Sequence, residues 1–271
     1  MEQAILLKML NQAQYELMTY PHMRAGYYLL RPFRTVFGVP YKHRDRMAFP
    51  NALLAKALME FYQKNVNTEE GREVFELLKR YYDRWIFSGC KIRSIEDAYA
   101  GMALIDLHKI TGSEKYKTAA DKLAAYLMSR ETDDTGSILT YPKKGEGYVY
   151  ADTIGLICPF LAKYGKTYED MNTLNLAVTQ IQNYMSFGMD NKLILPYHGY
   201  EYESGLKYGI TGWGLAVGRL MMGMSETLYY MTPDRLGYED TRQAYRRIVD
   251  KVEAYQLQGG LYSWQLLAKD G

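Results

Sequence analysis

Apolar residues recur at helical spacing along most of the chain, and short stretches without that spacing separate them. Leu54, Leu58 and Phe61 fall at positions i, i+4 and i+7, which is one face of an α-helix, and Val74 and Leu78 begin a second such stripe. The same pattern predicts about ten helices in all, beginning near residues 3, 51, 69, 94, 113, 153, 168, 213 and 238 among others. The pattern therefore predicts pairs of helices joined by short turns along the chain.

Two stretches interrupt this pattern. Between Asp133 and Tyr150, glycines and Pro142 punctuate short β-prone runs, which predicts a hairpin over the helices. Residues 190 to 202 form a second short insert without helical spacing. Both inserts follow the second helix of a pair.

Paired helices without a parallel-sheet signal leave two architectures, an α-solenoid and a closed α/α toroid. Strict short-period repetition is missing and the inserts gather on one side, so we favour an all-α, (α/α)6-toroid-like fold with short β-hairpin inserts and a site at the loop end. We divide the chain into an N-terminal helix with a basic and aromatic segment, 1–48, and a toroid domain, 49–271. Within the first part, residues 20 to 48 could meet an acidic polymer or a membrane surface, but a solvated loop is the preferred interpretation.

Composition narrows the class of protein. The 271 residues are 48% hydrophobic, enough for a substantial core, and a formal net charge of +2 is too small to indicate a nucleic-acid partner. The 27 tyrosines suit cores with polar edges and also clefts that stack sugar rings. Cys90 and Cys158 form no Cys-x-x-Cys, no signal peptide is recognisable, and the longest uncharged apolar stretch is too short to span a bilayer. We expect a soluble, cytoplasmic protein with no membrane partner.

Asp152 is the first candidate for chemistry. It is the only charged residue between Glu146 and Lys163, and apolar surroundings disfavour the ionised form of a carboxyl group. That setting suits a proton carrier. The alternative is structural, because an Asp directly before a helical run is a standard N-cap.

Other kinds of site have little support in the sequence. The motifs of zinc proteases, serine hydrolases, phosphate-binding loops and EF-hands are all missing. The four histidines show no ligand spacing, so we expect neither a metal nor a cofactor. Catalysis would then rest on carboxylates.

Five segments resemble, in order, motifs of the unsaturated rhamnogalacturonyl and unsaturated glucuronyl hydrolases, glycoside hydrolase families 105 and 88. The segment from Ile95 to Gly101, continuing through Thr111 to Tyr116, is similar to their second helix pair. The segments that match their later motifs are Tyr150-Ala151-Asp152 through Tyr164, Pro196 to Tyr200, Gly212-Trp213, and Tyr255-Gln256 with Gly260-Leu261-Tyr262. The resemblance runs from about Asn51 to Tyr262.

This resemblance implies an (α/α)6 toroid that hydrates the 4,5 double bond of an unsaturated uronic acid at the non-reducing end of small oligosaccharides. By resemblance, Asp152 would protonate the vinyl ether carbon and then help water add to its neighbour. Asp97 would assist it, and two nearby carboxylates would raise one pKa. His198, Trp213 and Tyr150 would bind substrate. For Asp97 a helix cap is the alternative, for His198 a structural role in a turn, and for Trp213 a place in the core.

The departures from the family pattern matter as well. Lys207 and Gly209 stand where the family has Trp and Arg, so an arginine fork for the sugar carboxylate is missing and Lys207 would supply the cation. About ten helices are fewer than a closed ring of six pairs contains. As a hypothesis, segment 1–48 or a second subunit of a homo-oligomer covers the open ring. The alternative function is an inactive toroid relative that binds carbohydrate or a protein partner. The polysaccharide itself is not predicted.

Overall fold

A computed structural model describes residues 2–18, 36, 47–141 and 147–268. In this part of the chain most residues are helical, which confirms the all-α class. The helices are α1 (Glu2–Met18), α3 (Phe49–Lys64), α4 (Glu69–Phe87), η2 (Ile95–Ala100), α5 (Gly101–Thr111), α6 (Glu114–Met128), α7 (Ala151–Tyr168), α8 (Met171–Phe187), α9 (Gly214–Tyr230) and α10 (Tyr238–Glu253). The strands are β1 (Tyr148–Tyr150), β2 (Met189–Asp190), β3 (Leu195–Pro196), β4 (Gly199–Glu201) and β5 (Lys207–Tyr208).

The chain divides into two compact units. Unit 1 contains residues 1–93 and 102–119, and unit 2 contains residues 94–101 and 120–271. The predicted division at residues 48 and 49 stays a prediction, because most of the segment 20 to 48 lies outside the described residues. None of the helices in the described part of the chain combines the length and apolar character needed to cross a bilayer.

Unit 1 is built on the pair α3 and α4, which α1 also contacts. Their shared core contains Leu58 and Met59 of α3 and Val74 and Leu78 of α4, all nearly inaccessible to solvent. The Thr68 side chain caps α4 by accepting a hydrogen bond of 3.0 Å from the Gly71 amide. The hydrophobic stripes predicted for this region therefore face each other.

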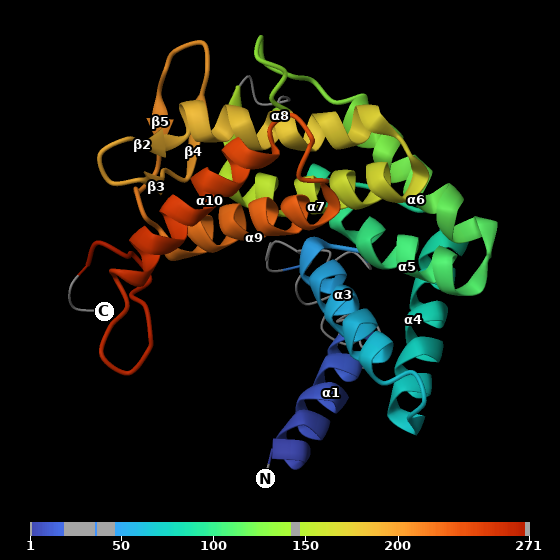
Figure 1. Ribbon diagram of the computed structural model, residues 1–271. Helices are drawn as coiled ribbons and strands as arrows, with labels where there is room; N and C mark the ends of the chain where they lie inside the picture. Colours follow the sequence, from blue (N-terminus) through green and yellow to red (C-terminus); the bar gives the residue numbers. More distant parts are fainter. Residues whose placement is uncertain (1, 19–35, 37–46, 142–146, 269–271) are drawn as a thin grey trace. The chain divides into compact units, whose positions relative to one another are not determined.

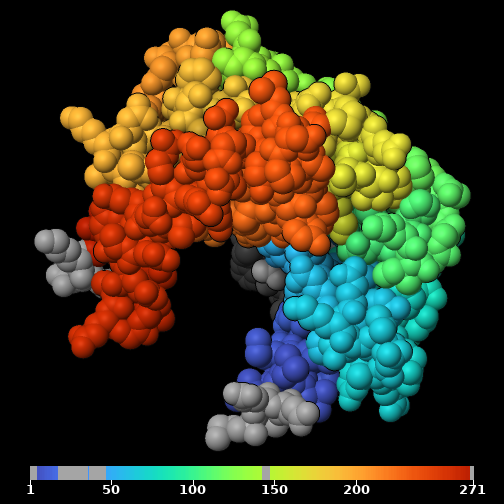
Figure 2. Space-filling model, viewed as in Figure 1, coloured from blue at the N-terminus to red at the C-terminus, as the bar shows by residue number. Residues whose placement is uncertain are grey.

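Unit 2 is organised around α7, which packs against both α8 and α9 (Figure 1). Every residue from Thr153 to Gly165 is buried, including Pro159, through which the helix continues. Two glycines let α7 and α9 approach closely, because a Cβ on Gly155 would lie 2.3 Å from the Arg219 carbonyl oxygen and one on Gly223 2.8 Å from that of Ile154. In Figure 2 α9 and α10, coloured orange, cover one face of this unit, with the red C-terminal segment beside them.

The two inserts meet in one sheet. Strand β1, from the first insert, pairs antiparallel with β4, from the second, and β4 pairs with β5. Within the first insert, Thr132 bridges Ile138, and the Thr140 amide donates a hydrogen bond of 2.9 Å to the carbonyl oxygen of Tyr148. The hairpin predicted from 133 to 150 is therefore only partly correct, because its last strand finds its partner in the other insert. A further difference is that the helix predicted from residue 94 begins as the 3-10 turn η2.

Candidate active site

Asp152 lies at the point where β1 becomes α7. Tyr150 occupies the N-cap position with extended backbone angles, so Asp152 is the second helical residue and the N-cap alternative is wrong. The amide of Ala151 donates a hydrogen bond of 2.9 Å to the carbonyl oxygen of His198, which ties the start of α7 to the turn before β4. Asp152 thereby projects toward the second insert, where its carboxylate is only partly exposed.

The imidazole of His198 is the direct partner of Asp152. Its Nε2 lies 2.9 Å from Asp152 Oδ2, a hydrogen bond in which the protonation of the two groups decides which atom donates. The ring stands 4.7 Å from the ring of Tyr150 and 4.8 Å, edge to face, from that of Trp213. Three of the predicted site residues therefore meet at the imidazole, which contacts Asp152, and the aromatic rings fix its orientation.

Gly209 completes the support of His198. It has a φ of +79°, and a Cβ there would lie 2.6 Å from the Cβ of His198. A larger residue would meet both a strained backbone and the histidine. This close approach gives a physical reason why the chain carries glycine at this position.

A third carboxyl group, that of Glu96 on η2, shares this environment. Burial raises its pKa from 4.5 to about 6, with further increases from the charges of Asp152 and Asp97, while Arg219 opposes the increase. Burial, followed by the charges of Glu96 and Asp152, also raises the pKa of Tyr141, whose side chain is exposed. The pair expected at Asp97 and Asp152 stays a prediction, and the raised pKa is found at Glu96, on which the charges of both aspartates act.

Asp97 has a structural role in this arrangement. Only 5% of it is exposed, and its Oδ2 accepts a hydrogen bond of 3.2 Å from the Ser94 amide in a reciprocal capping box. The alternative interpretation of Asp97 as a helix cap is thus confirmed. The cap fixes the turn η2, and in doing so it positions the neighbouring Glu96.

The cation beside these carboxyl groups is Arg219, from the first turns of α9. Its backbone lies against Gly155, three residues after Asp152 on α7. Its charge reaches Glu96, whose pKa it lowers. The close contact between α7 and α9 therefore brings a guanidinium into the neighbourhood of the carboxyl groups.

Lys207 is placed differently. Its ammonium donates a hydrogen bond to the carbonyl oxygen of Met189 and lies 5.3 Å from the centre of the Tyr197 ring. Successive side chains of a strand point to opposite faces, so Lys207 points away from the face that carries its neighbour Tyr208. The structure does not bring this ammonium to Asp152.

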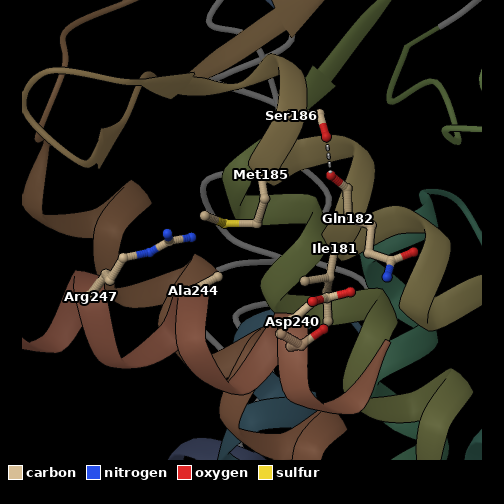
Figure 3. A pocket seen from close by; sticks show the side chains of 8 residues that line it. Ile181, Gln182, Met185, Ser186, Asp240, Ala244 and Arg247 are labelled. Carbon is tan, nitrogen blue, oxygen red and sulfur yellow. Dashed lines mark hydrogen bonds between the residues drawn. The ribbon is translucent and has the colours of Figure 1, made fainter. Parts of the chain in front are cut away.

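A separate hollow of about 490 Å³ lies between α8 and α10 (Figure 3). Ile181, Met185 and Ala244 form its apolar part, and Asp240 and Arg247 are among its polar residues. It shares no residue with the group around Asp152. No cluster of three metal-binding side chains occurs among the residues that the structure describes.

Comparison with solved structures defines the class of fold. A glycoside hydrolase of family 105 from C. acetobutylicum ATCC 824 superposes with a TM-score of 0.72 at 18% identity, covering 88% of this chain and 69% of that one. The unsaturated glucuronyl hydrolase from Bacillus sp. GL1 superposes with a TM-score of 0.66 at 16% identity, covering 84% and 63%. The fold is thus that of the α/α-toroid enzymes, as expected.

The family model of Glycosyl Hydrolase Family 88 matches residues 34–271, so the chain belongs to this family. The unsaturated rhamnogalacturonyl hydrolase YesR of Bacillus subtilis strain 168 is 25% identical over 164 residues, which are 59% of this chain and 48% of that protein. The chain therefore spans about half the length of this relative. The resemblance read from the motifs is confirmed.

Glu96 and Arg219 were missed by the sequence analysis. Glu96 stands next to Asp97 in a recognised segment, so its chemistry was available, but the motif drew attention to the aspartate. Arg219 lies inside a predicted helix and outside every matched motif. Only the packing of α9 against α7 singles it out.

Proposed function

We propose that this protein hydrates the C4–C5 double bond of an unsaturated uronic acid at the non-reducing end of small oligosaccharides, which releases the neighbouring sugar. Membership of family 88 and the similarity to an unsaturated rhamnogalacturonyl hydrolase support this class of reaction. The observation that carries the proposal is the Asp152 carboxyl group, which is hydrogen-bonded to His198 and whose charge acts on the buried carboxyl group of Glu96.

The reaction needs a proton at C4 and the oxygen of water at C5. In its protonated form Asp152 gives the proton to C4 and takes one back from the water that adds to C5, so that it ends in its starting state. The product is a hemiketal at C5, whose ring opens and frees the sugar attached at C1. Glu96 takes over the assisting role first expected of Asp97, since its pKa of about 6 lets it hold a proton close to neutral pH.

The surrounding side chains suit a sugar acid. Tyr150, His198 and Trp213 provide the ring surfaces around Asp152. Arg219 provides the positive charge that the sugar carboxylate needs, in place of Lys207 and of the arginine of the related enzymes. A glycoside hydrolase with these groups requires no cofactor in this scheme.

Hydration removes the ultraviolet absorbance of the double bond, so incubation with unsaturated disaccharides from lyase digests of rhamnogalacturonan and of glucuronate polymers tests the proposal. We expect absorbance to fall with at least one disaccharide. Asp152→Asn should lower kcat by about 10²- to 10⁴-fold, the usual contribution of general acid and base catalysis. Asp240→Asn, an exposed aspartate on α10, is the matched control and should leave kcat unchanged.

Unchanged absorbance with every lyase product would reject the enzyme assignment. Binding of the same oligosaccharides without turnover would instead support the alternative of an inactive relative that binds carbohydrate. A full rate in Asp152→Asn would reject Asp152 as the proton carrier while leaving the reaction itself in place.

A further inference from the structure

The three-stranded sheet has two unlike faces. Val149 and Tyr200 point to one face and are 0% and 1% exposed, so that face packs on the core. Alternation along the strands places Tyr148, Tyr150 and Tyr208 on the opposite face. Gly199 lies between Tyr150 and Tyr208 in the pairing and leaves room for their rings, because a Cβ there would lie 2.8 Å from the Tyr150 ring.

The three rings form a continuous surface that starts at the candidate active site. The ring centre of Tyr150 lies 4.7 Å from that of His198, the hydrogen-bond partner of Asp152. From Tyr150 the ring centres of Tyr148 and Tyr208 are 6.0 Å and 5.9 Å away, and those two rings are 5.4 Å apart. The ring centre of Tyr208 also lies 6.0 Å from that of His198, so the surface leads from His198 across Tyr150 and Tyr208 to Tyr148.

Tyr148 and Tyr208 differ from the tyrosines whose hydroxyl groups form hydrogen bonds that stabilise the fold. The hydroxyl groups of Tyr116, Tyr164, Tyr184 and Tyr200 all have hydrogen-bond partners within the protein. Those of Tyr148 and Tyr208 make no hydrogen bond with any residue in the described part of the chain, and Tyr208 is 45% exposed. A flat apolar ring with an unused hydroxyl group is the kind of surface that a sugar ring can stack on and bond to.

We propose that Tyr148 and Tyr208 form an extension subsite. It would bind the third sugar of a substrate, counted from the unsaturated end, whereas the cleaved bond joins the first and second sugars. This subsite rests on the proposed function, which places the unsaturated end of the substrate at Asp152. With the unsaturated residue at Asp152 and its neighbour at Tyr150, a third sugar reaches Tyr148 and Tyr208. The preferred substrates are then unsaturated oligosaccharides longer than a disaccharide.

The test compares kcat/KM for an unsaturated disaccharide and trisaccharide of the same series. In the native protein the trisaccharide should be favoured by about two- to tenfold, the range that one aromatic contact supports. Tyr148→Ala should reduce this preference and leave the disaccharide unchanged, and Tyr208→Ala should lower kcat/KM for the trisaccharide more than for the disaccharide. Tyr148→Phe keeps the ring and should retain most of it, and Tyr229→Ala, an 80% exposed tyrosine on α9, is the control.

Equal kcat/KM for both lengths in the native protein would overturn the subsite, and so would an equal loss on both lengths in Tyr148→Ala and Tyr208→Ala. If no substrate is turned over, calorimetric titration with the same two oligosaccharides separates the questions. Tighter binding of the trisaccharide that is lost in Tyr148→Ala would uphold the subsite although the proposed reaction had failed. Equal binding, or none, would overturn it.

Discussion

At the scale of single residues, the candidate site is a set of side chains whose charges depend on one another. Asp152 is bonded to His198, and Glu96 is buried near Asp152 and Asp97 with Arg219 opposing the repulsion. Burial disfavours the charged form of Glu96, and so do the two neighbouring negative charges. The arrangement costs folding energy at neutral pH, as functional sites often do.

We predict that Glu96→Gln makes the protein more stable at pH 7 and less active. The pKa of Glu96 is raised in the folded state from 4.5 to about 6, so the folded protein holds a proton that the unfolded chain has lost, and stability falls as pH rises between these values. At pH 7 the cost is at most about 2 kcal/mol. Urea unfolding at pH 4 and pH 7 should show the gain only at pH 7.

The activity of the native protein should also fall as pH rises through about 6, where Glu96 loses its proton. Glu73→Gln, at an exposed glutamate on α4, serves as the control for both measurements and should change neither. A stability gain of the same size at both pH values would contradict the assigned pKa.

At the scale of elements, the contact between α7 and α9 decides where Arg219 lies. Gly155 is a helix-interior glycine, which costs stability relative to alanine unless close packing requires it. Close packing does require glycine at position 155, because the Arg219 backbone lies where the Cβ of a larger residue would be. The neighbouring Gly218 has open space where its Cβ would be. The two glycines thus form a matched pair.

Gly155→Ala should destabilise the protein by about 1–3 kcal/mol, because the helices must move apart to admit the methyl group. Gly218→Ala should stabilise it by up to about 1 kcal/mol through helix propensity alone. Urea unfolding measures both. Similar changes in the two variants would show that α7 and α9 do not touch at Gly155.

Sequence patterns predicted the helices and strands themselves better than they predicted which elements pack or pair with each other. The apolar stripes on α3 and α4 predicted both helices, since helical periodicity is a local property. Strand β1 was expected to pair within its own insert, yet it pairs with β4. Strand pairing depends on which distant segments meet, and a strand of three residues carries too little pattern to specify that.

At the scale of the whole molecule, the chain crosses between the two units more than once. Residues 94–101 belong to unit 2 although the segments on both sides belong to unit 1. Glu96 lies in this short crossing segment, so all the candidate site residues named above belong to unit 2. Unit 1 carries a different feature, an exposed apolar surface on α1, where Ile5, Leu6 and Met9 are 52%, 53% and 65% exposed.

We propose that this surface of α1 mediates association between copies of the chain, because exposed apolar patches commonly mark interfaces. Light scattering after size exclusion should give a mass above that of the monomer at high protein concentration. Ile5→Glu combined with Leu6→Glu should return it to the monomer value. Phe87→Glu, at an isolated residue that is 96% exposed, is the control. A monomer mass for the native protein at every concentration would reject this interface.

The sequence by itself determined the helices, the family, and the position of Asp152 where an extended segment becomes a helix, because these depend on local periodicity and short motifs. It also identified His198, Trp213 and Tyr150, whose rings meet at His198, the hydrogen-bond partner of Asp152. Only the tertiary structure decided which carboxyl group and which cation join them. Asp97 accepts a capping hydrogen bond, Lys207 points to the other face of its strand, and the charges of Asp152 and Arg219 both act on Glu96. The physical reason is that charges interact through space, so the choice among neighbouring candidates depends on how η2, α7 and α9 pack.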